Sequence, residues 1–162
     1  MTPIIRYIFL FIFLACASLL GVGLYLQEVK HLLPCPLCVA QRVAYWLIGL
    51  TALAAWLHKP ATWGRRLYSG FLILFSLAGA AVALHHAWLI RYPEATAGCS
   101  ASPEERFLNA LPIAKWWPGM FEASGDCASV TWSFMSLAIP DWSLVWFLIL
   151  GGVAAYTFFR TK

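Results

Sequence analysis

The sequence is poor in charged residues. Only 11% of its 162 residues are Asp, Glu, Lys or Arg, whereas soluble domains carry about a quarter. Hydrophobic residues make up 62% of the chain, and nine residues are Trp. The eleven Lys and Arg form no basic run, which argues against a nucleic-acid-binding surface. This composition excludes a water-soluble globular protein and predicts an integral membrane protein.

Four stretches of the chain are long and apolar. Each approaches the roughly 20 residues that a helix needs to cross a bilayer core, so four of them leave room only for loops. A cleaved signal peptide is an alternative for the first stretch, but such a peptide has a shorter apolar region, and this one stays apolar beyond Cys16. We predict one all-α membrane domain over residues 1–162, a bundle of four transmembrane helices at about residues 7–26, 39–57, 67–90 and 142–159.

Acidic residues are absent from one side of this arrangement. The basic residues on that side are Arg6, Lys59, Arg65, Arg66, Arg160 and Lys162. All seven Asp and Glu fall on the other side, with Lys30, Arg42, Arg91, Arg106 and Lys115. Lys and Arg are enriched in cytoplasmic loops. Both termini are therefore predicted to be cytoplasmic, and residues 27–40 and 91–141 to face outward.

The five cysteines divide unevenly in this topology. Cys35, Cys38, Cys99 and Cys127 lie on the outer side, while Cys16 is alone in the first span. Disulfides persist in oxidising compartments. Two pairs of cysteines on the outer side suit the oxidising bacterial periplasm. The protein is therefore expected in the inner membrane, whose outer side faces the periplasm.

The longer outer loop is irregular apart from one apolar island, Phe107 to Phe121. Its Trp116 and Trp117 suggest a short segment in the headgroup region, where indole rings are favoured. The island is interpreted as an interfacial anchor. A surface for docking a partner is the alternative.

The pair Cys35 and Cys38 has three interpretations: a redox-active disulfide, half of a zinc site, or a structural bridge. Zinc needs four ligands, and the loop offers only Cys99 and Cys127, 28 positions apart, with no second C-x-x-C and no paired histidine. No metal is therefore expected. A bridge over so short a loop stabilises little. Cys38 falls in the first turn of the second span, where free N–H groups favour a thiolate, so redox chemistry is favoured.

Arg42 follows Cys38 by four residues and so lies on the same helix face, one turn deeper. A charge at that depth is costly and is usually kept for a pathway or ligand. It could stabilise a Cys38 thiolate and an anionic ligand, or it could only anchor the helix. His86 reaches a similar depth on the third span, while His85 points elsewhere. We expect Arg42 and His86 around one pocket, although a histidine can also serve packing alone.

Three motifs carry a resemblance that covers essentially the whole chain. They are PCPLCVAQR at the outer start of the second span, HAWLIRYPEATAGC from His86 to Cys99, and KWWPGMFEASGDC ending at Cys127. In their order and topology they resemble the DsbB family of bacterial inner-membrane thiol:quinone oxidoreductases. The resemblance implies a four-helix bundle, a ubiquinone or menaquinone acceptor, and a periplasmic thioredoxin-like donor similar to DsbA.

Residue roles follow from the same resemblance. Cys99 and Cys127 match a loop disulfide attacked by the partner, and Cys35 and Cys38 match the pair that passes electrons to quinone. An interloop intermediate such as Cys35–Cys127 would free the Cys38 thiolate to attack the quinone ring. Arg42 and His86 match positions of the quinone pocket. Cys16 matches no such role and is expected to be a small buried hydrophobe.

Two other functions compete with this one. The vitamin K epoxide reductase family is also a small helical bundle with a C-x-x-C at the membrane edge, and it reduces a quinone-type substrate. A non-catalytic membrane scaffold held by two external disulfides is the second. Inert, fully oxidised cysteines would favour the scaffold, and a thiolate–quinone charge-transfer band would favour an enzyme.

Overall fold

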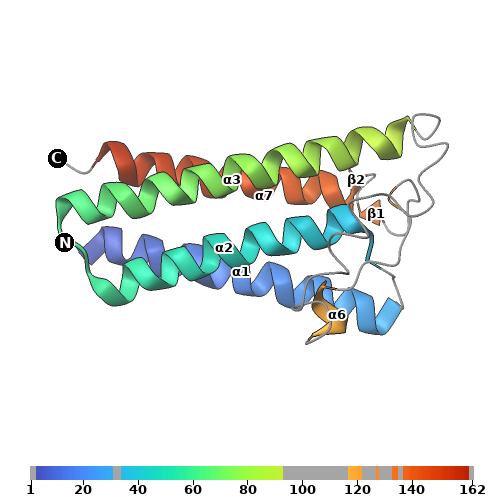
Figure 1. The fold of residues 1–162 in the computed structure, drawn as a ribbon, viewed down its shortest axis with the longest axis horizontal. Helices are drawn as coiled ribbons and strands as arrows, with labels where there is room; N and C mark the ends of the chain where they lie inside the picture. Colours follow the sequence, from blue (N-terminus) through green and yellow to red (C-terminus); the bar gives the residue numbers. More distant parts are fainter. Residues whose placement is uncertain are drawn as a thin grey trace.

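The computed structural model describes residues 3–30, 34–92, 117–121, 127, 133–134 and 137–160. Its main elements are four long helices, α1 (Pro3–Lys30), α2 (Pro36–His58), α3 (Thr62–Arg91) and α7 (Ile139–Phe159). They lie side by side along the long axis of the molecule (Figure 1). Each is long and apolar enough to cross a membrane. The predicted all-α bundle of four transmembrane helices is confirmed.

The helices are longer than the apolar stretches that predicted them. α1 continues to Lys30, and α3 begins at Thr62 and includes Arg65 and Arg66. A helix satisfies its own backbone hydrogen bonds, so it need not end where the hydrocarbon ends. Hydropathy therefore marks the part of each helix inside the lipid and underestimates its full length.

α2 and α3 are joined by a three-residue turn, residues 59–61. Lys59 ends α2 with a left-handed backbone, φ 47°, and Pro60 follows it, where a helix cannot continue. So short a connection makes the two helices antiparallel neighbours. It also puts the start of α2, with its cysteines, at the same end of the bundle as the end of α3, with its histidines.

The bundle is packed through α1 with α2, α2 with α3, and α3 with α7. The last of these contacts is close: a Cβ added to Gly79 would lie 2.4 Å from the Phe147 ring. Phe147 also stacks on Tyr45 with the ring centroids 4.3 Å apart. Cys16 is buried in the same core. Small residues at helix contacts are typical of membrane bundles, since they let backbones approach.

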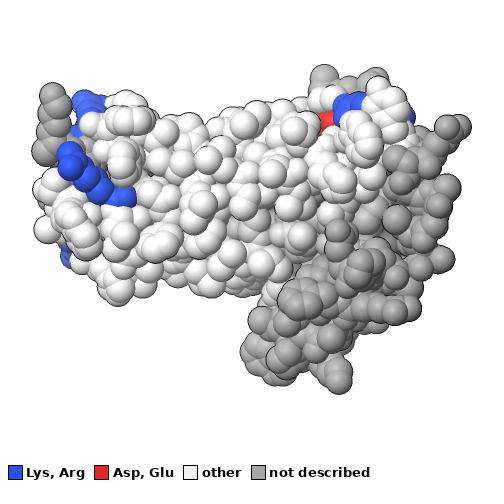
Figure 2. All heavy atoms as spheres, turned by 45° about the horizontal axis from the view of Figure 1, so that its top comes forward, with Lys and Arg blue, Asp and Glu red and all other residues white. Residues whose placement is uncertain are grey.

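The outer surface of the bundle is apolar at mid-height. The exposed large side chains there include Leu14, Leu50, Leu74, Leu77 and Leu148. Figure 2 shows this uncharged band on one face, where the charged side chains of the described residues lie near the two ends of the molecule. Such a band fits contact with lipid chains.

One short helix and two short strands lie at the end of the bundle opposite the chain termini (Figure 1). α6 (Pro118–Phe121) places Met120 in the hydrophobic core and leaves Trp117, which precedes it, half exposed. Trp117 and α6 fall within the predicted interfacial island, whose remaining residues, 107–116, lie outside the described residues. Strands β1 (Ser133–Phe134) and β2 (Leu137–Ala138) pair antiparallel, Phe134 opposite Leu137, and lead into α7.

Candidate redox site

The two cysteines of the C-x-x-C motif form the start of α2. Cys35 is the N-cap residue and is buried, and Pro36 takes the first helical position. The Cys35 Sγ accepts the Cys38 backbone N–H at 3.3 Å and donates to the Cys38 Sγ at 3.1 Å. A disulfide would bring the two sulfurs to about 2.05 Å. The predicted Cys35–Cys38 disulfide is thus not formed here, and both residues are free thiols.

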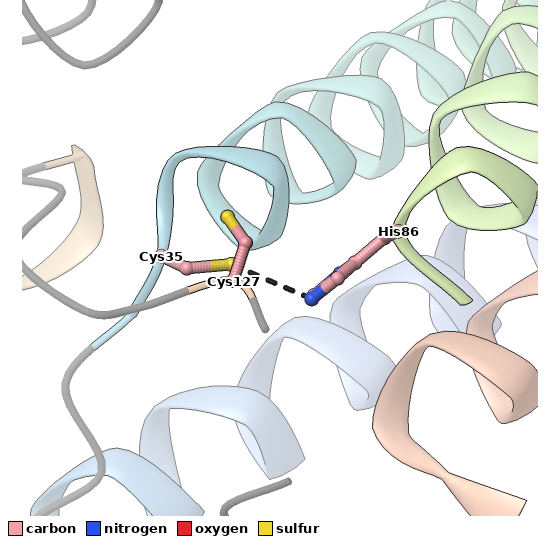
Figure 3. Close-up of side chains that lie close together, drawn as sticks. All are labelled: Cys35, His86 and Cys127. Atoms are coloured by element: carbon pink, nitrogen blue, oxygen red, sulfur yellow. Dashed lines mark hydrogen bonds between the residues drawn. The ribbon is translucent and has the colours of Figure 1, made fainter. Parts of the chain in front are cut away.

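Cys127 and His86 complete a cluster built from three separate segments. The Sγ atoms of Cys35 and Cys127 and a ring nitrogen of His86 all lie within 4.8 Å of one another. Figure 3 shows the three side chains converging, with His86 reaching in from α3. The His86 Nε2 is 3.6 Å from the Cys35 Sγ. Cys99, the predicted disulfide partner of Cys127, lies outside the described residues.

Gln41, which the sequence did not single out, joins this cluster. Its side chain is buried, and its Nε2 lies 3.2 Å from the His86 Nδ1. When the amide donates to Nδ1, the ring proton sits on Nε2 and points at the Cys35 sulfur. In the sequence, Gln41 could have been recognised as an uncharged polar residue inside a predicted span, one turn after Cys38.

The thiol cluster changes the acidity of Cys35, which precedes the membrane-spanning helix. Hydrogen bonding with the Cys127 sulfur and then with the Cys38 sulfur, together with burial, raises the pKa of Cys35 well above its ordinary range. Cys35 therefore keeps its proton at neutral pH. That proton is the one it shares with Cys38.

Arg42 lies one helical turn below Cys38. Its Nη1 donates to the Gln27 Oε1 of α1 at 2.9 Å and to the Met120 carbonyl of α6 at 3.3 Å. The guanidinium thus connects three elements at the end of the bundle that holds the cysteines. These contacts give it a structural role beside any role toward a ligand.

A cavity of about 130 Å³ opens beside Arg42, between α1, α2 and α7. Gln27, Cys38, Gln41 and Arg42 line its polar side. It continues into an apolar groove of about 310 Å³ that includes Trp142 and Trp146. The residues shared by the two are Leu19, Gly23, Leu26, Tyr45, Ile139 and Ser143.

Arg42 and His86, expected around one pocket, face different parts of the site. Arg42 lines the cavity, whereas His86 is not among its lining residues and contacts the Cys35 sulfur. Gln41 connects the two parts, because it lines the cavity and contacts the His86 ring. His85, the neighbour of His86, is exposed, as its position on the helix predicted.

Four membrane-spanning helices with a cysteine cluster at one end define a multi-pass membrane protein suited to thiol redox chemistry. The sequence model of the family described as Disulfide bond formation protein DsbB matches residues 5–157. The chain belongs to the DsbB family, and the resemblance of its motifs to that family is confirmed. Membership makes it a disulfide-forming oxidoreductase of the membrane.

Relatives match along nearly the whole chain. Disulfide bond formation protein B of Nitrosospira multiformis is 61% identical over 152 residues, which cover 94% of this chain and 90% of that protein. Its counterpart in Nitrosomonas eutropha is 61% identical over 149 residues, or 92% and 91% of the two chains. Disulfide bond formation protein B 1 of Pseudomonas aeruginosa is 38% identical over 155 residues, or 96% and 95%. The match therefore includes all four helices and the loops between them.

Proposed function

We propose that this protein is a thiol:quinone oxidoreductase that reoxidises a DsbA-like dithiol and passes the electrons through two cysteine pairs to a membrane quinone. The observation that carries the proposal is the convergence of Cys35 and Cys127 within 4.8 Å, with Cys38 3.1 Å from Cys35. Sulfurs this close can exchange a disulfide after small movements.

The proposed route moves one disulfide at a time. A partner thiolate attacks the Cys99–Cys127 disulfide, and the resolved partner leaves oxidised. The reduced Cys127 then attacks Cys35 of a Cys35–Cys38 disulfide, forming Cys35–Cys127 and releasing Cys38 as a thiolate. Cys99 next attacks Cys127, which restores the loop disulfide and leaves Cys35 and Cys38 holding the two electrons. Each exchange breaks one S–S bond and forms another, so both electrons reach the Cys35–Cys38 pair.

The cavity beside Cys38 has the residues that a quinone head group requires. Arg42 and Gln41 supply N–H donors for its carbonyl oxygens, and the apolar groove with Trp142 and Trp146 suits an isoprenoid tail. A bound quinone would accept two electrons and two protons at this point. Arg42, one turn from Cys38, would stabilise negative charge on the sulfur and on the reduced ring.

His86 is assigned to the sulfur side of the site. With the ring proton on Nε2, His86 donates toward the Cys35 sulfur at 3.6 Å. A donor there stabilises negative charge on Cys35 whenever Cys35 is the leaving group of an exchange. His86 would therefore act on disulfide transfer more than on quinone binding.

We infer a location in the bacterial inner membrane, with the whole chain as one integral domain and both termini cytoplasmic. The distribution of basic residues supports this orientation. Lys59 and Arg65 lie at the end of the bundle where the chain begins and ends, and the cysteine cluster lies at the other (Figure 1). The cluster would then face the periplasm and a soluble partner.

The deciding experiment supplies membranes containing the protein with a reduced thioredoxin-like dithiol and follows quinone absorbance. One quinone should be reduced for each dithiol oxidised, and Cys38→Ser should abolish the reaction. Membranes with the Cys16→Ser variant serve as the matched control and should retain it. Oxidation of the dithiol without quinone reduction would refute the proposed acceptor.

A further inference from the structure

The thiol cluster has the composition of a soft-metal site. Cys35, Cys127 and His86 present their ligand atoms within 4.8 Å of one another, and Cys38 adds a third sulfur 3.1 Å from Cys35. Three thiols and one imidazole are the ligand set of many structural zinc sites. From the sequence, the C-x-x-C pair allowed half of a zinc site but no metal was expected, because the other ligands come from the end of α3 and an isolated loop position.

For three of the four ligands, the observed spacing is compatible with a tetrahedral ion. Bonds of about 2.3 Å to sulfur and about 2.0 Å to nitrogen place neighbouring ligand atoms about 3.5 to 3.8 Å apart. The Cys35 Sγ and His86 Nε2 are 3.6 Å apart. The Cys38 sulfur is not part of the group of three that lies within 4.8 Å. To become the fourth ligand it would have to move about 0.7 Å away from the Cys35 sulfur and closer to Cys127 and His86.

The surroundings of the cluster also fit a metal. A histidine that binds through Nε2 needs a partner for its Nδ1–H, and the buried Gln41 amide is beside that atom. After the amide turns over, its oxygen accepts the Nδ1–H. Three thiolates and a divalent ion leave one net negative charge. Arg42, one turn below Cys38, supplies the opposite charge.

We propose that the fully reduced protein binds one zinc-class divalent cation through Cys35, Cys38, Cys127 and His86, with Gln41 positioning the histidine. Binding releases the three thiol protons and transfers no electrons. A disulfide between any two of these cysteines removes two ligands, so only the reduced state binds the ion. The ion must leave before a disulfide can form, and it therefore competes with oxidation of the cysteines.

Cobalt(II) is the probe for this site, since its absorption distinguishes tetrahedral thiolate coordination from six-coordinate oxygen ligation. The full-length protein, reduced and kept without oxygen in detergent, is titrated with Co²⁺ alone. One equivalent should bind with tetrahedral bands and thiolate-to-cobalt charge transfer, and Zn²⁺ should displace it. The same protein in its oxidised state should bind none, which controls for folding.

Substitutions then test each ligand. Gln41→Leu should weaken Co²⁺ binding about ten- to a hundredfold, the usual effect of losing a partner of a ligating histidine. Cys127→Ser and His86→Ala should weaken it more than that. His85→Ala and Cys16→Ser are the matched controls, a neighbouring exposed histidine and a buried thiol outside the cluster, and should bind like the original protein.

Three results would overturn the proposal: only six-coordinate cobalt bands, equal binding by the oxidised protein, or undiminished binding by Cys127→Ser or His86→Ala. Loss of binding in Cys99→Ser with retention in Cys127→Ser would also overturn it. The titration contains no quinone and no dithiol. Its failure therefore leaves the proposed oxidoreductase activity standing, and failure of that activity leaves the metal site standing.

Discussion

Arg42 combines two demands on a single residue. Its guanidinium is one helical turn after Cys38 in α2, inside the predicted span, where an unpaired charge is costly. Its Nη1 donates to the Gln27 side chain and to the Met120 carbonyl. The same side chain lines the cavity with Cys38. A purely structural role and a role toward quinone therefore predict different effects of substitution.

Replacing Arg42 with Met should raise the apparent KM for quinone. Loss of one charge-assisted contact of about 1.5 to 3 kcal/mol corresponds to roughly ten- to a hundredfold in affinity. Lys should rescue only in part, because it keeps the charge and loses the planar fork. Quinone reduction and membrane yield are measured together.

Gln27→Leu breaks the same contact between α1 and α2 and keeps the charge, but Gln27 also lines the cavity. A smaller KM effect than that of Arg42→Met is therefore expected. If Arg42→Met keeps a normal KM with a reduced yield, Arg42 is an anchor.

The cluster also predicts where a trapped disulfide will form. In a Cys38→Ser variant the Cys35 thiol has no partner within the motif, and the Cys127 sulfur is its neighbour. Attack on the Cys99–Cys127 disulfide should give Cys35–Cys127 and free Cys99. Digestion without reductant, followed by mass spectrometry, should find this linked peptide pair. A Cys35–Cys99 link in its place would contradict the assignment of Cys127 as the central sulfur.

At the scale of elements, the contact between α3 and α7 depends on the absence of one side chain. A Cβ on Gly79 would lie 2.4 to 2.7 Å from three atoms of the Phe147 ring, and that ring is already stacked on Tyr45. The ring cannot withdraw without breaking the stack. The helices would have to separate.

Gly79→Ala should therefore lower the free energy of unfolding by about 1 to 3 kcal/mol, the usual cost of overpacking a core. Gly70→Ala is the matched control on the same helix, because nothing lies within 4 Å of its added Cβ. It should be neutral, or stabilising by up to about 1 kcal/mol from helix propensity. Reversible unfolding in mixed micelles measures both. Equal stability of the two variants would show that the α3–α7 contact has room to relax.

The helices and the cysteine motif could be predicted from the sequence because each depends on local properties. The length of an apolar run and the spacing of Cys35 and Cys38 need no knowledge of neighbours. The proximity of Gln41 to His86, and of Gly79 to Phe147, depends on how separate helices pack. It cannot be predicted from the periodicity of residues along one helix. For the same reason Arg42 and His86, predicted from equal depth to share a pocket, face different parts of the site.

The whole molecule is polarised along its long axis. α2 runs from the cysteines to Lys59, and α3 returns from Arg65 to His86, so basic residues without acidic neighbours gather at one end and thiols at the other. The ion pair between Arg91 and Asp141, 2.8 Å apart, joins α3 to α7 at the thiol end. A bilayer with an oxidising compartment on one side provides a matching asymmetry. Orientation in the membrane is thus the property on which thiol access depends.

Access of a membrane-impermeant thiol reagent tests this orientation directly. In intact spheroplasts treated with a reductant, the reagent should modify Cys99 and Cys127, since the distribution of Lys and Arg predicts that residues 91–141 lie outside. Cys16 should stay unmodified until the protein is denatured, because its side chain is buried between helices at mid-bundle. A cysteine introduced at Thr62, an exposed position at the opposite end of the bundle, is the control for sidedness and should react only after lysis. If Thr62→Cys reacts in intact spheroplasts while Cys99 and Cys127 are protected until lysis, the orientation is inverted, and a periplasmic dithiol could not be the electron donor.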